Sequence, residues 1–130
     1  MRLGGDYQGQ GPLLTADRTF VSADTVITAN AIDSGNGGRV ILWADGNTGF
    51  FGDISANGGD ISGNGGFVEI SGKQNLTFQG TVTTHAPQGE AGVLLLDPAS
   101  IFIRASAPQA DDAQVIADGI INGNDGPFGG

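Results

Sequence analysis

The pentapeptide Ser34-Gly-Asn-Gly-Gly38 recurs without change as Ser62-Gly-Asn-Gly-Gly66, 28 residues further along the chain. The agreement continues past the pentapeptide, where apolar residues recur in pairs: Val40 and Val68, Leu42 and Ile70, Phe50 and Phe78, Ile54 and Val82. A neighbouring echo begins at Ile27 and again at Ile54, and a looser third copy begins at Gly89. The period is therefore about 27 residues, which is typical of solenoid proteins.

Within each copy, apolar residues alternate with polar ones. Val40 and Leu42 share one parity, and so do Val68 and Ile70. A period of two residues predicts β-strands, with the polar residues between them, such as Glu69, facing water. Sustained helical spacing is missing from the sequence between positions 20 and 103, so alternating strands and helices are not expected.

Strands that recur once per copy, without helices or hairpin-length reversals, favour coils of parallel strands stacked about 4.8 Å apart. Equivalent residues then form ladders, with Phe50 on Phe78 and Asn36 on Asn64. The sequence predicts an all-β fold, a parallel β-helix or β-solenoid, over residues 1–104. A Gly/Asp/Pro-rich C-terminal segment follows at 105–130, with a candidate short helix at 106–119 packed on the flank. A β-sandwich of similar hairpins stays open as an alternative.

The composition excludes several classes of partner. The chain has 130 residues, with 14 acidic and 5 basic ones, and a formal net charge of -9. This charge repels nucleic acid and anionic lipid. Cysteine is absent, which excludes disulfides and thiolate metal sites. No stretch approaches the roughly 20 apolar residues of a membrane span, and residues 1–11 lack the pattern of a signal peptide.

Residues suited to acid–base chemistry are few and scattered. Asp53 and Asp60 fit turn positions as well as they fit a carboxylate pair. His85 is the only histidine and lies in a loop-like segment. The glycine-rich stretches lack the third glycine and the aspartate of calcium-binding nonapeptide repeats, and the pentapeptide at 34–38 lacks the lysine of a phosphate loop. We therefore expect a protein that is not an enzyme, with no catalytic residue, cofactor or metal.

One set of residues does not fit a purely structural interpretation. If Val40 and Leu42 point inward, Ile41 and Trp43 point outward, and Phe51 and Phe67 are expected to join them. A contiguous cluster of outward apolar groups indicates either a surface covered by another segment or a partner site. The four residues Ile41, Trp43, Phe51 and Phe67 are therefore candidates for partner binding or for packing, with the C-terminal segment as the candidate cover.

An ordered series of motifs resembles a known family. Its segments are Gly4–Gly9, Arg18–Ser22, Gly38–Asp45, Phe51–Gly59, Ser62–Lys73 and Leu94–Pro98. Together they resemble the large bacterial exoproteins of the filamentous haemagglutinin type, which are exported by two-partner secretion. This resemblance implies a right-handed parallel β-helix, an outer-membrane secretion partner, a secreted or cell-surface location, and a role in adhesion or surface structure. It supplies no catalytic residues.

The length of the chain suggests how such a module would work. Fewer than five rungs of about 27 residues fit into it, and the ends of so short a solenoid expose unpaired strand edges. We expect these ends to self-associate, either within a longer adhesin shaft or head to tail in a filament. The alternative is a module that binds a glycan or another cell-surface receptor through the outward aromatic residues.

Overall fold

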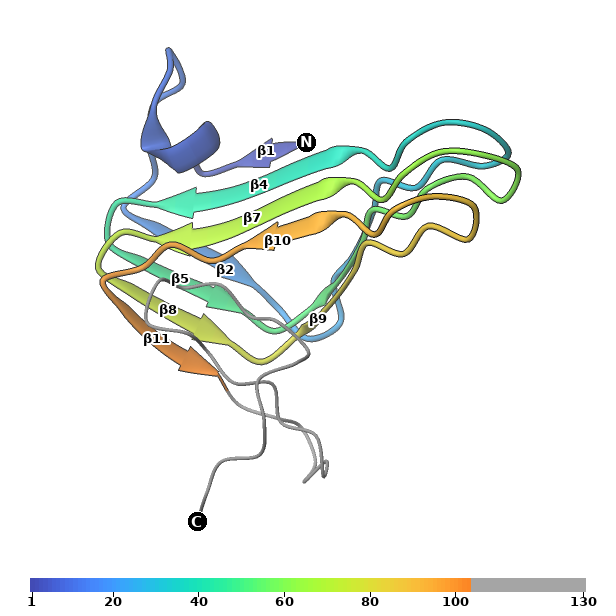
Figure 1. Ribbon diagram of the computed structural model, residues 1–130. Helices are drawn as coiled ribbons and strands as arrows, with labels where there is room; N and C mark the ends of the chain where they lie inside the picture. Colours follow the sequence, from blue (N-terminus) through green and yellow to red (C-terminus); the bar gives the residue numbers. More distant parts are fainter. Residues whose placement is uncertain (104–130) are drawn as a thin grey trace.

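The computed structural model describes residues 1–103, which form a parallel β-solenoid of about three turns (Figure 1). Every strand pair within residues 1–103 is parallel, so the predicted solenoid is confirmed and the sandwich alternative is wrong. No α-helix occurs within residues 1–103. The C-terminal segment 105–130 and its expected short helix lie outside this described part of the chain.

Three sheets form the walls of the solenoid, and each complete turn of the described chain adds one strand to each sheet. Sheet A consists of β1 (Arg2–Leu3), β4 (Arg39–Ala44), β7 (Phe67–Gly72) and β10 (Val93–Leu95). Sheet B consists of β2 (Arg18–Val21), β5 (Asn47–Phe50), β8 (Asn75–Phe78) and β11 (Ser100–Ile103). Sheet C consists of β3 (Val26–Thr28), β6 (Asp53–Ser55) and β9 (Thr81–Thr83).

The register between the two central turns follows the sequence repeat. In all three sheets, residues 28 apart lie opposite each other, so that Val40 pairs with Val68 and Phe50 with Phe78. The period is therefore about 28 residues, close to the expected 27. The inward side chains form one continuous core, in which the Phe50 and Phe78 rings lie 5.3 Å apart.

Long loops connect sheet C to sheet A in every turn, at residues 29–38, 56–66 and 84–92, and extend together on one side of the solenoid (Figure 1). Asparagine ladders hold these loops in register. The Asn64 N–H donates to Asn36 Oδ1 at 2.9 Å, which confirms the predicted stack. A second ladder joins the Asn57 N–H to Asn30 Oδ1 at 2.8 Å. Each loop is thereby fixed to the one before it.

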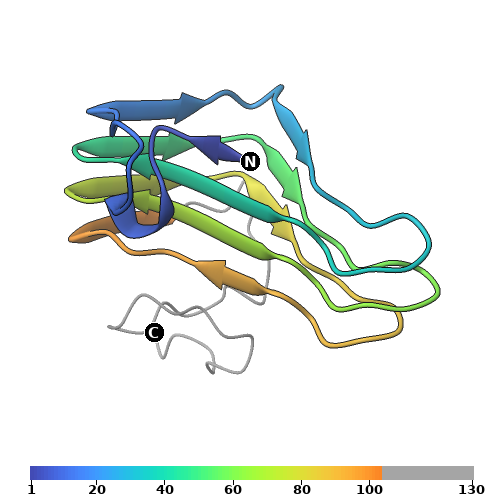
Figure 2. The ribbon, with the colours of Figure 1, turned by 90° about the horizontal axis from the view of Figure 1, so that it is seen from above.

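The first turn departs from the repeat. Arg2 of β1 pairs with Ile41 of β4, an offset of 39, so this turn is 11 residues longer than the next. The additional residues belong to a segment at 4–16, here called the N-terminal strap, which contains the short 3-10 turn η1 (Tyr7–Gly9). The strap leaves β1 and crosses the outer side of the stacked turns (Figure 2).

Candidate functional site

Ile41 and Trp43 lie on the outer face of sheet A, but both are buried. Ile41 is 1% exposed and Trp43 is 6% exposed. The strap covers Trp43: a Cβ atom added to Gly9 would lie 2.4 Å from Cζ2 of the indole, and one added to Gly5 would lie 2.8 Å from Cδ1. Burial of this extent supports a packing role for these two residues.

The strap is held to the solenoid on both sides of Trp43. The Trp43 Nε1–H donates to Asp45 Oδ1 at 3.0 Å, and the Thr15 hydroxyl of the strap donates to the same carboxylate. The hydrogen bond from Thr15, and to a smaller extent the one from Trp43, lowers the pKa of Asp45 below its usual value. The Asp45 carboxylate therefore joins the strap to the corner between sheets A and B.

Glu69 forms the second attachment of the strap. The prediction that it faces water is wrong, because its side chain is completely buried. The Gln8 N–H donates to the two carboxylate oxygens at 3.1 and 3.2 Å, and the Ser71 hydroxyl donates to Oε1 at 3.0 Å. Burial raises the pKa of Glu69, and the hydrogen bonds from Gln8 and Ser71 offset part of that rise.

The backbone of η1 is shaped for this contact. Gln8 has φ 51° and ψ 29°, a left-handed conformation that residues other than glycine adopt rarely. Glu69 and Gln8 are 61 positions apart, so no local sequence pattern predicts their contact. The available signal was the length of the first turn, together with the glycines that precede β2.

Phe67 lies at the border of the strap and is half-buried. Its ring meets the Tyr7 ring edge to face at 5.9 Å. The Arg39 guanidinium lies over both rings, 4.9 Å from the Tyr7 centroid and 4.8 Å from the Phe67 centroid. This cation–π cluster attaches the strap to β4 and β7, and it engages Phe67 within the chain itself.

Phe51 belongs to a different face. It lies on the outer side of sheet B, with its ring 5.4 Å from that of Phe20. Phe20 and Phe102 on the same face are 69% and 60% exposed, and neither was among the predicted site residues. Their parity could have identified them, since each is next to an inward residue. The four predicted residues are thus divided between a covered face and an open one.

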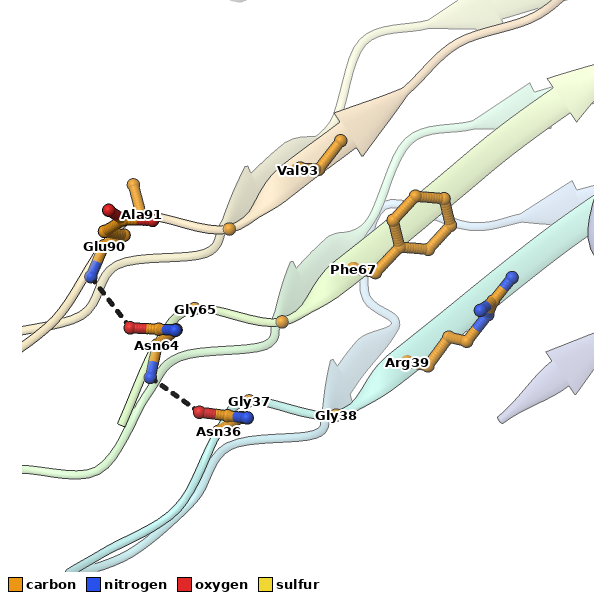
Figure 3. Close-up of a pocket in the computed structure, with 12 residues that line it drawn as sticks. Asn36, Gly37, Gly38, Arg39, Asn64, Gly65, Phe67, Glu90, Ala91 and Val93 are labelled. Carbon is orange, nitrogen blue, oxygen red and sulfur yellow. Dashed lines mark hydrogen bonds between the residues drawn. The ribbon is translucent and has the colours of Figure 1, made fainter. Parts of the chain in front are cut away.

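The repeated pentapeptides border a shallow groove of about 400 Å³ (Figure 3). The stick view shows Asn36, Asn64 and Glu90 joined by hydrogen bonds along the groove. Close backbone packing explains the glycines here: a Cβ atom at Gly65 would lie 1.9 Å from the Thr84 carbonyl oxygen. The groove therefore arises from the way the loop arms join sheet A, as expected for residues that turn a corner.

Side chains that could act in acid–base catalysis or bind a metal ion do not cluster in the described part of the chain. Between residues 1 and 103, no group of three or more His, Asp or Glu side chains could hold a metal ion. Asp53 lies on β6 and accepts a hydrogen bond from Thr81, whereas Asp60 lies in the loop at 56–66. The His85 backbone N–H donates to Asn57 Oδ1 at 2.8 Å. No helix among these residues is long and apolar enough to cross a membrane.

Comparison with known proteins found no match to any family model, any curated protein or any solved structure. The resemblance to filamentous haemagglutinin-type exoproteins therefore stays a prediction from the sequence motifs.

Proposed function

We propose that the chain is a non-catalytic, extracellular β-solenoid module with a structural and adhesive role. It contributes rungs to an adhesin shaft or stacks head to tail into a surface filament. The observation that carries the proposal is the constant register: the same three-sheet cross-section repeats every 28 residues, so one turn is a template for the next. Repeats of this kind contact only their neighbours and extend readily along one axis.

Unpaired strand edges support axial assembly. Among the strands of residues 1–103, β2 at the N-terminal end of the stack pairs only with β5, and β3 pairs only with β6. At the opposite end, β9 pairs only with β6 among the strands described. A second copy placed about 4.8 Å beyond would bring its β3 alongside β9 and continue sheet C. Contact between different surfaces of identical chains does not close and produces an open fibre.

Secretion and location follow from the same proposal. As part of a filamentous haemagglutinin-type exoprotein, the module would cross the outer membrane through a dedicated secretion partner and function at the cell surface. The net charge of -9 is compatible with an extracellular role that does not involve nucleic acid.

The test is electron microscopy of the purified chain at micromolar concentration, with sedimentation velocity alongside. Long filaments of uniform width are expected. Compact monomers over the whole concentration range would contradict axial self-assembly.

A proline on the free edge of β3 makes this test specific. The Asp53 N–H donates to the Thr25 carbonyl and the Ala29 N–H donates to the Ser55 carbonyl. The alternation of a parallel ladder therefore directs the N–H of Thr28 away from β6, towards the N-terminal end. Thr28→Pro removes this donor and should shorten or abolish filaments while strand content is kept. The matched control, Thr28→Ala, should assemble like the parent chain.

A further inference from the structure

The outer face of sheet B carries a row of residues that differs from the rest of the surface. The register aligns Phe20, Gly49, Thr77 and Phe102 across the four strands β2, β5, β8 and β11. Three steps between strands place the two phenylalanines roughly 14 Å apart. Because Gly49 has no side chain and Thr77 has a short one, the row forms a trough with an exposed aromatic ring at each end.

A third ring lies along one side of this trough. Phe51 lies beside Phe20 with the ring planes tilted by 45°. Phe51, Thr77, Gln79 and Phe102 line a shallow groove of about 400 Å³. A Cβ atom at Gly49 would lie 3.1 Å from Phe51 Cε2 and 3.2 Å from Phe20 Cδ2, so the glycine allows the two rings to lie close to the strand at this end of the trough.

Asparagine amides line the side of the trough that lies across from Phe51. Asn47 and Asn75 form the neighbouring row and are both exposed, and the Asn75 Nδ2–H donates to Asn47 Oδ1 at 2.8 Å. Gln79 is also exposed and lies on the same side of the trough as Phe51. Phenyl faces therefore lie next to amide and hydroxyl groups, a combination suited to ligands that present both C–H faces and hydroxyl groups.

The distribution of charge narrows the class of ligand. Among the residues that the structure describes, the rows of this face carry one charged side chain, Arg18, whose Nε lies 3.9 Å from the Asp17 carboxylate. Carboxylates flank the sheet on both sides: Asp45 lies at the corner with sheet A, near Lys73, and Asp53 lies on β6 of sheet C. In a chain of net charge -9, this border repels phosphate, sulfate and uronate groups. The ligand that complements this face is uncharged.

We propose that the outer face of sheet B binds an uncharged saccharide chain, which lies along the trough from Phe20 to Phe102, parallel to the solenoid axis. The rings of Phe20, Phe51 and Phe102 pack against the C–H faces of the sugar rings, and Gln79 and the asparagine row hydrogen-bond to hydroxyl groups. A protein partner fits less well, because stable protein interfaces bury about 800 Å² on each side and the apolar surface here is interrupted by Gly49 and Thr77.

This inference deepens the adhesive part of the proposed function and does not depend on axial assembly. The binding experiment therefore uses the Thr28→Pro chain beside the parent chain. If the Thr28→Pro chain is monomeric and still binds, the face acts without filaments. If filaments form but no saccharide is bound, the saccharide proposal is wrong and axial assembly stands.

The test measures binding to a panel of uncharged hexose oligosaccharides by isothermal titration calorimetry, with the same oligosaccharides in sulfated form for comparison. At least one uncharged member should bind, and its sulfated form should bind more weakly. Phe102→Ala and Gly49→Val should each weaken binding roughly tenfold, a loss of about 1.4 kcal/mol, since one removes a ring and the other displaces the Phe20 and Phe51 rings that lie against Gly49. Far-UV circular dichroism checks that each variant is folded.

Leu14→Ala is the matched control, because Leu14 is an apolar residue with 96% exposure that belongs to the strap and to none of the strands of sheet B. Its binding should equal that of the parent chain. The proposal is overturned if no uncharged member binds, if sulfated forms bind as tightly as uncharged ones, or if Phe102→Ala and Gly49→Val bind like Leu14→Ala.

Discussion

Phe50→Ala tests the register on which the solenoid depends. Phe50 is completely buried and its ring packs against that of Phe78. Truncating a buried phenylalanine costs about 3–5 kcal/mol, a large part of the roughly 5–15 kcal/mol that stabilises a typical domain. With a urea m-value of about 1–3 kcal/mol/M, the unfolding midpoint should fall by about 1 M or more.

Phe20→Ala is the matched control, because Phe20 lies on a neighbouring strand of the same sheet but has the opposite parity. Its ring is 69% exposed and contacts the Phe51 ring. The loss should stay below about 1 kcal/mol. Urea titration followed by far-UV circular dichroism compares the two variants. A larger loss for Phe20→Ala than for Phe50→Ala would refute the register, since a one-residue slip exchanges the two faces of a strand.

Three further predictions concern the strap and the ladders. Burial raises the pKa of Glu69, so its contribution to stability is present below the ordinary glutamate pKa and is lost as the pH rises through the raised value. Glu69→Gln should therefore gain in melting temperature relative to the parent as the pH rises from acidic to neutral; a constant difference would contradict this. Gly9→Val should displace the strap from Trp43, the only tryptophan, and shift its fluorescence to longer wavelength; unchanged emission would show that the strap does not cover the indole. Asn36→Ala removes the acceptor of the Asn64 N–H and should cost about 0.5–1.5 kcal/mol in urea unfolding, whereas no loss would mean that water replaces the ladder.

The repeated part of the fold could be predicted from the sequence because its contacts recur. Each inward residue meets an equivalent residue one period away, so the parity of Val40 and Phe50 and the 28-residue offset together determine sheet, face and register. Asn36 and Asn64 were predictable for the same reason. The alternation specifies which side of a strand is buried, and the period specifies which strand lies beside it.

The strap could not be predicted in the same way because it occurs once. Its contacts to Trp43 and Glu69 have no equivalent in the next turn, and they bury two outward side chains that parity alone would leave exposed. Alternation identifies the outward direction of a side chain, but it does not show whether another segment covers that side. The open face of sheet B was missed because Phe20 and Phe102 lie in the first and last strands of the sheet, where the repeat is weakest.

Fibre diffraction from oriented assemblies of the chain tests the proposed role most directly. If copies stack through their free strand edges, strands lie across the filament, and a reflection at about 4.8 Å should appear along the filament axis. The same preparation of Thr28→Pro should give no oriented fibres. A 4.8 Å reflection perpendicular to the axis, or a parent chain that stays monomeric under assembly conditions, would contradict axial stacking as the function of this solenoid.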